Sequence, residues 1–275
     1  MEKISFFKMS GSGNDFIIID NRAGRVSETG LTRMISNVCR RKMSVGADGF
    51  ILIEPSVNVD FKWRFYNSDG SVAEMCGNGA RCAARFAWLN GIAGRGMAFE
   101  TDAGVISAQV TNDRVKIRMT DPLDLKIDYP VALKNGPMTL SSVNTGVPHA
   151  VVLIEDADRA PVTEVGSEIR YHRDFAPAGT NVNFVCLQGD NAIAIRTYER
   201  GVEDETLACG TGSVAAAIVM ASKELMNSPV NVVTRSGVTL TIHFRKTPQG
   251  VSDVYLEGDA RVIYKGELWE ESWNY

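Results

Sequence analysis

Short apolar segments rich in β-branched and aromatic residues, each ending in a turn signal, recur along the chain and are typical of strands. The clearest are FIIID (16–20), GFILIE (49–54), FKWRFYN (61–67) and AIAIRTYE (192–199). Helical patterns follow only some of them, the clearest at residues 78–90, closed by Gly91, and 213–226, closed before Pro229. The pattern predicts an α/β fold.

The two predicted helices are apolar around most of their circumference. Their sequences include AARFAWL and VAAAIVMA, whereas a helix lying on a protein surface has a single apolar stripe. Each helix should therefore be buried on several sides. A curved sheet wrapped around a central helix would satisfy this pattern.

The sequence also repeats itself. CGNGARCAARFA, which begins at Cys76, is echoed by CGTGSVAAAIVM, which begins at Cys209, an offset of 209 − 76 = 133 residues. The same offset relates Gly77 to Gly210, Gly79 to Gly212, Thr101 to Thr234, Gly104 to Gly237 and Val105 to Val238. A weaker echo pairs GSGNDFIII (11–19) with GTNVNFVCL (179–187).

The repeat predicts two similar, pseudo-symmetric α/β domains. We place the N-terminal one at residues 1–124, carrying Cys76, and the C-terminal one at 125–265, carrying Cys209. A chain of 275 residues is consistent with two domains of ordinary size. The tail 266–275 contains two tryptophans, which must be covered, and we expect it to pack on the N-terminal domain.

Composition and charge narrow the class of protein. The chain is 44% hydrophobic and 23% charged, and 29 basic against 33 acidic residues give a net charge of −4. That balance disfavours nucleic acid or an anionic membrane as partner. No apolar run approaches the roughly 20 residues that span a bilayer, and no export signal is evident. We therefore expect a cytoplasmic protein, and the balanced charge favours action on a small molecule. Five cysteines, an odd count, indicate reduced thiols.

Each repeat is a strand, a turn, a cysteine and then Gly-x-Gly at the start of a helix. This order places a thiol and several unpaired backbone N–H groups at a helix N-terminus. A cysteine titrates near ~8.5, and the positive end of a helix dipole favours its thiolate. The glycines allow a carboxylate to approach the bare backbone.

Two such corners, facing each other across the cleft between the domains, suit the inversion of a stereocentre. Racemisation without a cofactor needs a base on one face of the α-carbon and an acid on the other. A lone cysteine at a helix start is usually a small buried packing residue, but matched duplication argues against that interpretation for Cys76 and Cys209. Cys82 lies inside the apolar helix and fits core packing, and Cys39 and Cys186 carry no motif.

A metal site is not expected. The sequence contains no CxxC pair and only three histidines, His149, His172 and His243, which disfavours a zinc site. The proton transfer described above requires no cofactor, so we expect none.

Over nearly its whole length the sequence resembles the diaminopimelate epimerase family. The motifs that carry the resemblance occur in the family's order: SGSGNDFIIID, YNSDGSVAEMCGNGARC, GVPH, NVNF and YERGVEDETLACGTGS. The resemblance implies cofactor-independent interconversion of LL- and meso-diaminopimelate in lysine and peptidoglycan precursor biosynthesis. It also implies two similar domains, each a curved mixed sheet around a central helix, and a homodimer.

Roles transfer by position in these motifs. Cys76 and Cys209 match the paired acid and base, and His149 and Glu199 match residues that tune the thiols. The remaining matches are substrate-binding positions: Asn14, Asn67, Asn181 and Arg200, the last on the distal carboxylate, and Gly77, Asn78, Gly210 and Thr211, which cradle the α-carboxylate. Without the motifs, the asparagines fit turn chemistry, Arg200 a surface cation and His149 a structural histidine.

Two departures from the family pattern concern the substrate. Some members carry Gln where this chain has Gly49, and some carry Asn where it has Val147. A racemase of another amino acid, such as histidine or proline, that uses the same two cysteines is therefore an alternative. A non-catalytic ligand-binding protein or thiol redox sensor is a second one. Phenazine-type isomerases share the fold but lack the paired cysteines.

Overall fold

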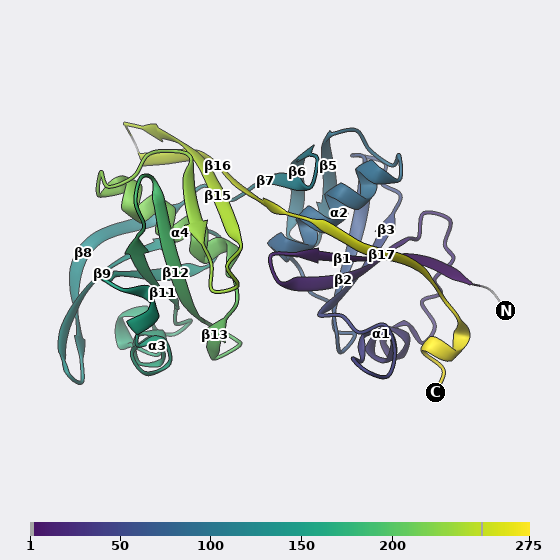
Figure 1. The fold of residues 1–275 in the computed structure, drawn as a ribbon, viewed down its shortest axis with the longest axis horizontal. Coiled ribbons are helices and arrows are strands. Elements are labelled where there is room, and N and C mark those ends of the chain that lie inside the picture. Colours follow the sequence, from purple (N-terminus) through teal and green to yellow (C-terminus); the bar gives the residue numbers. More distant parts are fainter. Residues whose placement is uncertain (1–2, 249) are drawn as a thin grey trace. The chain divides into compact units, whose positions relative to one another are not determined.

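The computed structural model describes residues 3–248 and 250–275, and the chain divides into two compact units (Figure 1). Unit 1 contains the residues up to Ile117 together with Gly258–Tyr275, and unit 2 contains Arg118–Glu257. These bounds differ from the domains predicted at 1–124 and 125–265. The reason is strand pairing: the last strand, β17 (Arg261–Leu268), pairs antiparallel with β1 (Ile4–Gly11) and so belongs to unit 1.

Unit 1 is a mixed eight-stranded sheet with one short and one long helix. The sheet order is β17-β1-β2-β3-β4-β5-β6-β7, with parallel pairs β2/β3 and β4/β5 and antiparallel pairs elsewhere. Its other elements are β2 (Asn14–Asp20), α1 (Leu31–Cys39), β3 (Gly49–Glu54), β4 (Phe61–Asn67), α2 (Gly77–Leu89), β5 (Gly96–Thr101), β6 (Gly104–Thr111), β7 (Arg114–Arg118) and the 3-10 turn η3 (Glu270–Ser272).

Unit 2 repeats this arrangement. The sheet order is β8-β9-β10-β11-β12-β14-β15-β16, parallel at β10/β11 and β12/β14, and the short strand β13 also pairs with β12. Its elements are β8 (Leu123–Leu133), β9 (Gly136–Asn144), β10 (Pro148–Leu153), η1 (Ala157–Arg159), α3 (Val162–Arg170), η2 (Arg173–Phe175), β11 (Asn181–Leu187), β12 (Ala192–Glu199), β13 (Asp204–Thr206), α4 (Gly210–Ser222), β14 (Val230–Val233), β15 (Thr239–Thr247) and β16 (Gly250–Asp259).

The two units share one order of parallel and antiparallel pairs, which confirms the internal repeat. Helices α2 and α4 are offset by 133 residues at both ends, since 210 − 77 = 133 and 222 − 89 = 133. The weaker echo of 11–19 with 179–187 is wrong. It aligns β2 with β11, whereas the topological equivalent of β2 is β10, the first strand of the parallel pair in unit 2.

The long helix of each unit is central to its core, as the apolar patterning predicted. Helix α2 packs on β1, β2, β3 and β6, and α4 contacts strands from β8 to β15, so that each sheet curves around its helix (Figure 1). Every residue of α4 from Gly212 to Ala221 is buried. This helix begins earlier than the predicted 213–226 because Cys209 is its N-cap, and it ends at Ser222.

The C-terminal tail packs on unit 1. Trp273 lies against the apolar cluster that includes Leu31 and Ile35 of α1. The amide of Asn37 donates to the backbone oxygen of Trp273 at 2.8 Å. Among the described residues, no helix is long and apolar enough to cross a membrane.

Candidate active site

Cys76 caps the N-terminus of α2 in unit 1. Its backbone is extended (φ −145°) while the next residue is already helical, which is the usual N-cap geometry. The half-buried thiol accepts a hydrogen bond from the backbone N–H of Gly79, with the nitrogen 3.5 Å from Sγ. The helix start therefore presents a sulfur and the donors of its first turn together, as the Cys-Gly-x-Gly spacing predicted.

A buried polar network holds the first turn of α2. Asn78 donates through Nδ2 to Asn14 Oδ1 at 2.7 Å, which brings two of the predicted substrate-binding residues into direct contact. Arg81 donates through Nη2 to Asn78 Oδ1 at 2.8 Å and to Ser12 Oγ at 2.7 Å. It also donates to the backbone oxygens of Gly77, at 3.3 Å, and Asp259, at 3.2 Å.

Arg81 was missed by the sequence analysis although its side chain is fully buried. A charged residue in a helix that is apolar on all sides must have buried partners, because an unpaired buried charge is very unfavourable. That rule could have marked Arg81 as part of the site. Its hydrogen bonds fix the side-chain orientation of Asn78.

Two further unit 1 residues that the sequence analysis singled out, Asn67 and Gly49, lie outside this network. Asn67, at the exposed end of β4, donates through Nδ2 to Ser71 Oγ at 3.0 Å and belongs to the turn before Cys76. At Gly49, an added Cβ would lie 2.6 Å from a ring carbon of Phe65 and 3.1 Å from one of Phe16. Two aromatic rings therefore fill the space that a side chain at position 49 would occupy.

Cys209 caps α4 in unit 2 and is buried. Burial raises the pKa of its thiol to about 12, and the charge of nearby Glu199 acts in the same direction. Hydrogen bonds from the Thr211 hydroxyl and from the backbone of Gly212 and Thr211 oppose this shift. Cys209 is thus a protonated thiol at neutral pH.

Glu199 is the last residue of β12, and Arg200 follows it directly. Burial raises the pKa of Glu199, while the Thr206 hydroxyl, which donates to Oε2 at 2.8 Å, lowers it. The side chain of Asn181 links two strand ends: it donates to the Pro148 oxygen at 3.0 Å and accepts from the Arg200 backbone N–H at 2.9 Å.

His149 lies on β10, in register with Asn181 of β11. Burial, together with the smaller effect of the Arg200 charge, lowers the pKa of its imidazole to about 3. Asn183 and Thr197, which the sequence analysis missed, join this group: Asn183 Nδ2 is 3.1 Å from His149 Nδ1, and Thr197 donates to Asn183 Oδ1 at 3.0 Å. The spacing of two in Asn-Val-Asn, which places both asparagines on one face of β11, could have identified Asn183.

The two helix starts have the same backbone conformation at the N-cap but differ in their side chains. At the 133-residue offset, Arg81 corresponds to Val214, so a buried cation lies behind one thiol and an aliphatic side chain behind the other. Within residues 3–248 and 250–275, no group of three or more His, Cys, Asp or Glu side chains could hold a metal ion. None of the five cysteines is in a disulfide.

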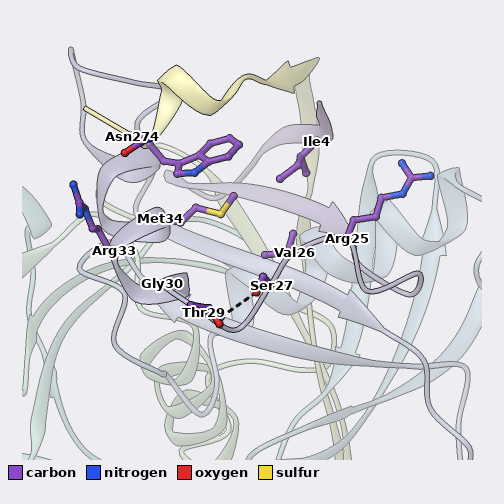
Figure 2. Close-up of a pocket in the computed structure, with 10 residues that line it drawn as sticks. Ile4, Arg25, Val26, Ser27, Thr29, Gly30, Arg33, Met34 and Asn274 are labelled. Atoms are coloured by element: carbon purple, nitrogen blue, oxygen red, sulfur yellow. Dashed lines mark hydrogen bonds between the residues drawn. The ribbon is translucent and has the colours of Figure 1, made fainter. Parts of the chain in front are cut away.

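A separate surface pocket of about 340 Å³ lies on unit 1, between the start of α1 and the C-terminal tail (Figure 2). Its lining includes Arg25, Thr29, Arg33, Met34 and Asn274. It contains no thiol or carboxylate side chain, and no predicted site residue lines it. It is therefore not a candidate for the chemistry of the two cysteines.

The fold matches those of solved two-domain proteins. The structure matches a Bacillus anthracis phenazine biosynthesis protein of the PhzF family with a TM-score of 0.74, at 18% identity, over 98% of this chain and 100% of the other. It matches a probable proline racemase from Agrobacterium radiobacter K84 with a TM-score of 0.68, at 13% identity, over 97% and 93%. At these identities the matches show that the chain shares the two-domain fold of these proteins.

Sequence comparison defines the family. The model of the diaminopimelate epimerase family matches residues 6–125 and 141–263. The diaminopimelate epimerase of Aquifex aeolicus is 47% identical over 99% of this chain and 100% of its own length, and that of Chlorobaculum tepidum is 42% identical over 94% and 99%. The chain belongs to the diaminopimelate epimerase family.

Proposed function

We propose that this protein interconverts LL- and meso-diaminopimelate by cofactor-independent proton transfer at the α-carbon. The observation that carries the proposal is the repeated helix start, in which Cys76 and Cys209 each cap a buried central helix beside the backbone N–H groups of its first turn. The full-length match to diaminopimelate epimerases supports the substrate.

In the proposed reaction one cysteine, as thiolate, removes the α-proton, and the other, as thiol, delivers a proton to the opposite face. The product has inverted configuration, and the two sulfurs have exchanged protonation states. Burial and the charge of Glu199 both raise the pKa of Cys209, so we assign Cys209 as the thiol of the resting pair. The N–H groups of the first turns, at Gly77, Asn78, Gly210 and Thr211, bind the α-carboxylate and stabilise the charge that develops as the proton leaves.

The remaining predicted residues serve binding. Arg200 has the planar fork that suits a carboxylate and would hold the distal one, and Asn14, Asn67 and Asn181 would contact polar groups of the substrate. His149 and Glu199, by contrast, would tune the two thiols. A homodimer and a cytoplasmic location belong to the same proposal, supported by the family resemblance and by five cysteines without a disulfide.

The test is to replace each cysteine separately. We expect Cys76→Ala and Cys209→Ala each to lower the rate of diaminopimelate epimerisation by at least about 1000-fold, because each face of the α-carbon needs its own acid or base. Incorporation of deuterium at the α-carbon in D2O, followed by NMR, measures this. Cys186→Ala is the control and should keep wild-type turnover. Near-normal turnover in either single variant would contradict the two-base mechanism.

The same assay tests the alternative substrate. Purified protein that exchanges the α-proton of proline or histidine in D2O, but leaves diaminopimelate unchanged, would be a racemase of another amino acid. We expect the opposite pattern.

A further inference from the structure

The orientation of the Asn183 side chain is determined by its surroundings. Asn183 is fully buried on β11, and its Nδ2 lies 3.0 Å from the backbone oxygen of Ala150. A carbonyl oxygen only accepts hydrogen bonds, so the amide atom facing it must be the NH2 group. The opposite end agrees, because Oδ1 accepts from the Thr197 hydroxyl at 3.0 Å.

This orientation determines which nitrogen of His149 carries the proton. The same NH2 group lies 3.1 Å from His149 Nδ1. Because an amide NH2 only donates, Nδ1 must be the acceptor and carries no proton. Burial lowers the pKa of His149 to about 3, so the ring is neutral and its single proton is on Nε2.

The Nε2–H group is the part of this network that is left unsatisfied. Nε2 is buried and has no hydrogen-bond partner among the described residues. An unpaired buried donor is unfavourable, and in native structures such groups call for a functional explanation. A bound ligand with an acceptor oxygen would supply the missing partner.

The charge beside His149 indicates the class of that ligand. Arg200 lies beside this strand end, because its backbone N–H donates to the side chain of Asn181, the register partner of His149, and its charge lowers the pKa of the imidazole. A cation and a neutral donor in one place favour an anionic acceptor, and carboxylates take hydrogen bonds from both. We propose that Asn183 is a positioning residue that holds His149 as the neutral Nε2–H tautomer, so that His149 donates to a substrate carboxylate and does not accept a proton. The identity of this carboxylate rests on the proposed function.

The position of Asn183 also connects His149 to the helix that Cys209 caps. A Cβ added at Gly212, in the first turn of α4, would lie 2.4 Å from Asn183 Oδ1. Glycine at this position lets the helix approach the amide closely. One side chain therefore contacts both the proposed carboxylate donor and the start of the Cys209 helix.

The tautomer can be tested without any activity assay. The protein has three histidines, so 15N-labelled histidine gives three rings, and His149→Gln assigns the signal. We expect long-range 1H–15N NMR to show His149 with a bare Nδ1 and a protonated Nε2, unchanged from pH 8 to pH 5. A His149 ring that is protonated on Nδ1, or doubly protonated in this range, would overturn the proposal.

Substitution of the amide provides the second arm. In Asn183→Asp the carboxylate accepts instead of donating, so we expect His149 Nδ1 to become protonated and kcat/KM to fall by about 10- to 100-fold. Asn21→Asp is the matched control, because Asn21 is also buried but bonds Glu54 and Val26. It should leave the His149 signal and kcat/KM unchanged. An unaltered His149 signal in Asn183→Asp would contradict the positioning role.

The third arm concerns the ligand. Adding diaminopimelate to the Cys76→Ala variant should move the His149 Nε2–H proton signal downfield as the hydrogen bond forms. If diaminopimelate at saturation leaves that signal in place, the donor role is wrong. If both single cysteine variants keep their turnover while the Nε2–H tautomer is observed, the proposed mechanism fails but the role of Asn183 stands, so the two failures are distinguishable.

Discussion

The two proposed catalytic thiols have opposite electrostatic surroundings. Cys209 is buried beside Glu199, and both effects raise the pKa of its thiol. Cys76 is half-buried, and the charge of the guanidinium of Arg81 interacts with it. A nearby cation favours a thiolate and a nearby carboxylate favours a thiol. The surroundings of the two thiols thus differ before any substrate binds.

Removing the Glu199 charge should make Cys209 easier to ionise. Because Glu199 raises the pKa of Cys209, Glu199→Gln should lower that pKa from about 12, and alkylation of Cys209 by iodoacetamide should begin at lower pH than in the wild type. Mass spectrometry of the Cys209 peptide after timed labelling measures this. Glu164→Gln, at an exposed position in the same unit, is the control. An identical pH profile in Glu199→Gln and wild type would count against the assigned influence of Glu199.

At the scale of elements, the starts of α2 and α4 have the same backbone conformation, but the side chains packed around them differ. The repeated glycines Gly79 and Gly212 meet different neighbours. An added Cβ at Gly79 has its nearest atoms at 3.4 Å, an ordinary contact, whereas at Gly212 it meets Asn183 Oδ1 at 2.4 Å and Cys209 Sγ at 3.2 Å. The close approach in unit 2 leaves no room for a methyl group.

We therefore expect Gly212→Ala to cost about 1–3 kcal/mol of folding free energy and to lower kcat/KM, because it displaces Asn183 or Cys209. Gly79→Ala should keep the fold at equal or higher stability, since alanine is the better helix former. Urea unfolding of both variants, together with steady-state kinetics, measures the difference. Equal effects of the two substitutions would show that the packing around the two helix starts does not differ in this way.

Arg81 is the second feature that distinguishes α2 from α4. Arg81→Met removes the donor to Asn78, Ser12 and two backbone oxygens, so we expect a loss of about 1–3 kcal/mol in stability. Arg85→Met, one turn further along the same helix, is the control, because Arg85 bonds only the Ala260 oxygen among the described contacts. Its loss should be clearly smaller. Thermal unfolding compares the two.

At the scale of the whole molecule, the strand that follows the repeated segment of each unit pairs with the sheet of the other unit. After β7 the chain continues into β8, which pairs with β9 of unit 2, and after β16 it continues into β17, which pairs with β1 of unit 1. Strands β8 and β17 are therefore topological equivalents. Unit 1 is completed only when the C-terminal segment returns, which makes its stability depend on the last residues of the chain.

The tail should therefore contribute to the stability of unit 1. Trp273 packs against the α1 cluster, so Trp273→Ala should cost about 1–2 kcal/mol and lower Tm by roughly 2–6 °C. Trp269→Ala is the matched control, because Trp269 is 47% exposed. Differential scanning calorimetry measures both. A Trp269→Ala variant that loses as much as Trp273→Ala would contradict the importance of this packing.

The features that were predicted correctly from the amino-acid sequence are those with local causes. The Cys-Gly-x-Gly spacing caps a helix through neighbouring backbone groups, and the apolar composition of residues 213–221 requires burial on all sides. Asn14 and Asn78 were each identified from their motifs, but their direct contact was not predicted. The proposed equivalence of residues 11–19 with 179–187 was wrong, because an Asn-rich turn before an apolar strand is too common to identify equivalent strands.

The sequence by itself determined the repeat and the placement of Cys76 and Cys209 at helix starts, because capping and periodicity act over a few neighbouring residues. Only the tertiary structure decided that β17 completes unit 1, that Arg81 is buried against Asn78, and that Asn183 orients His149. These depend on contacts between segments far apart in the chain, where the energy of a hydrogen bond or a packed side chain depends on the partner that the fold supplies.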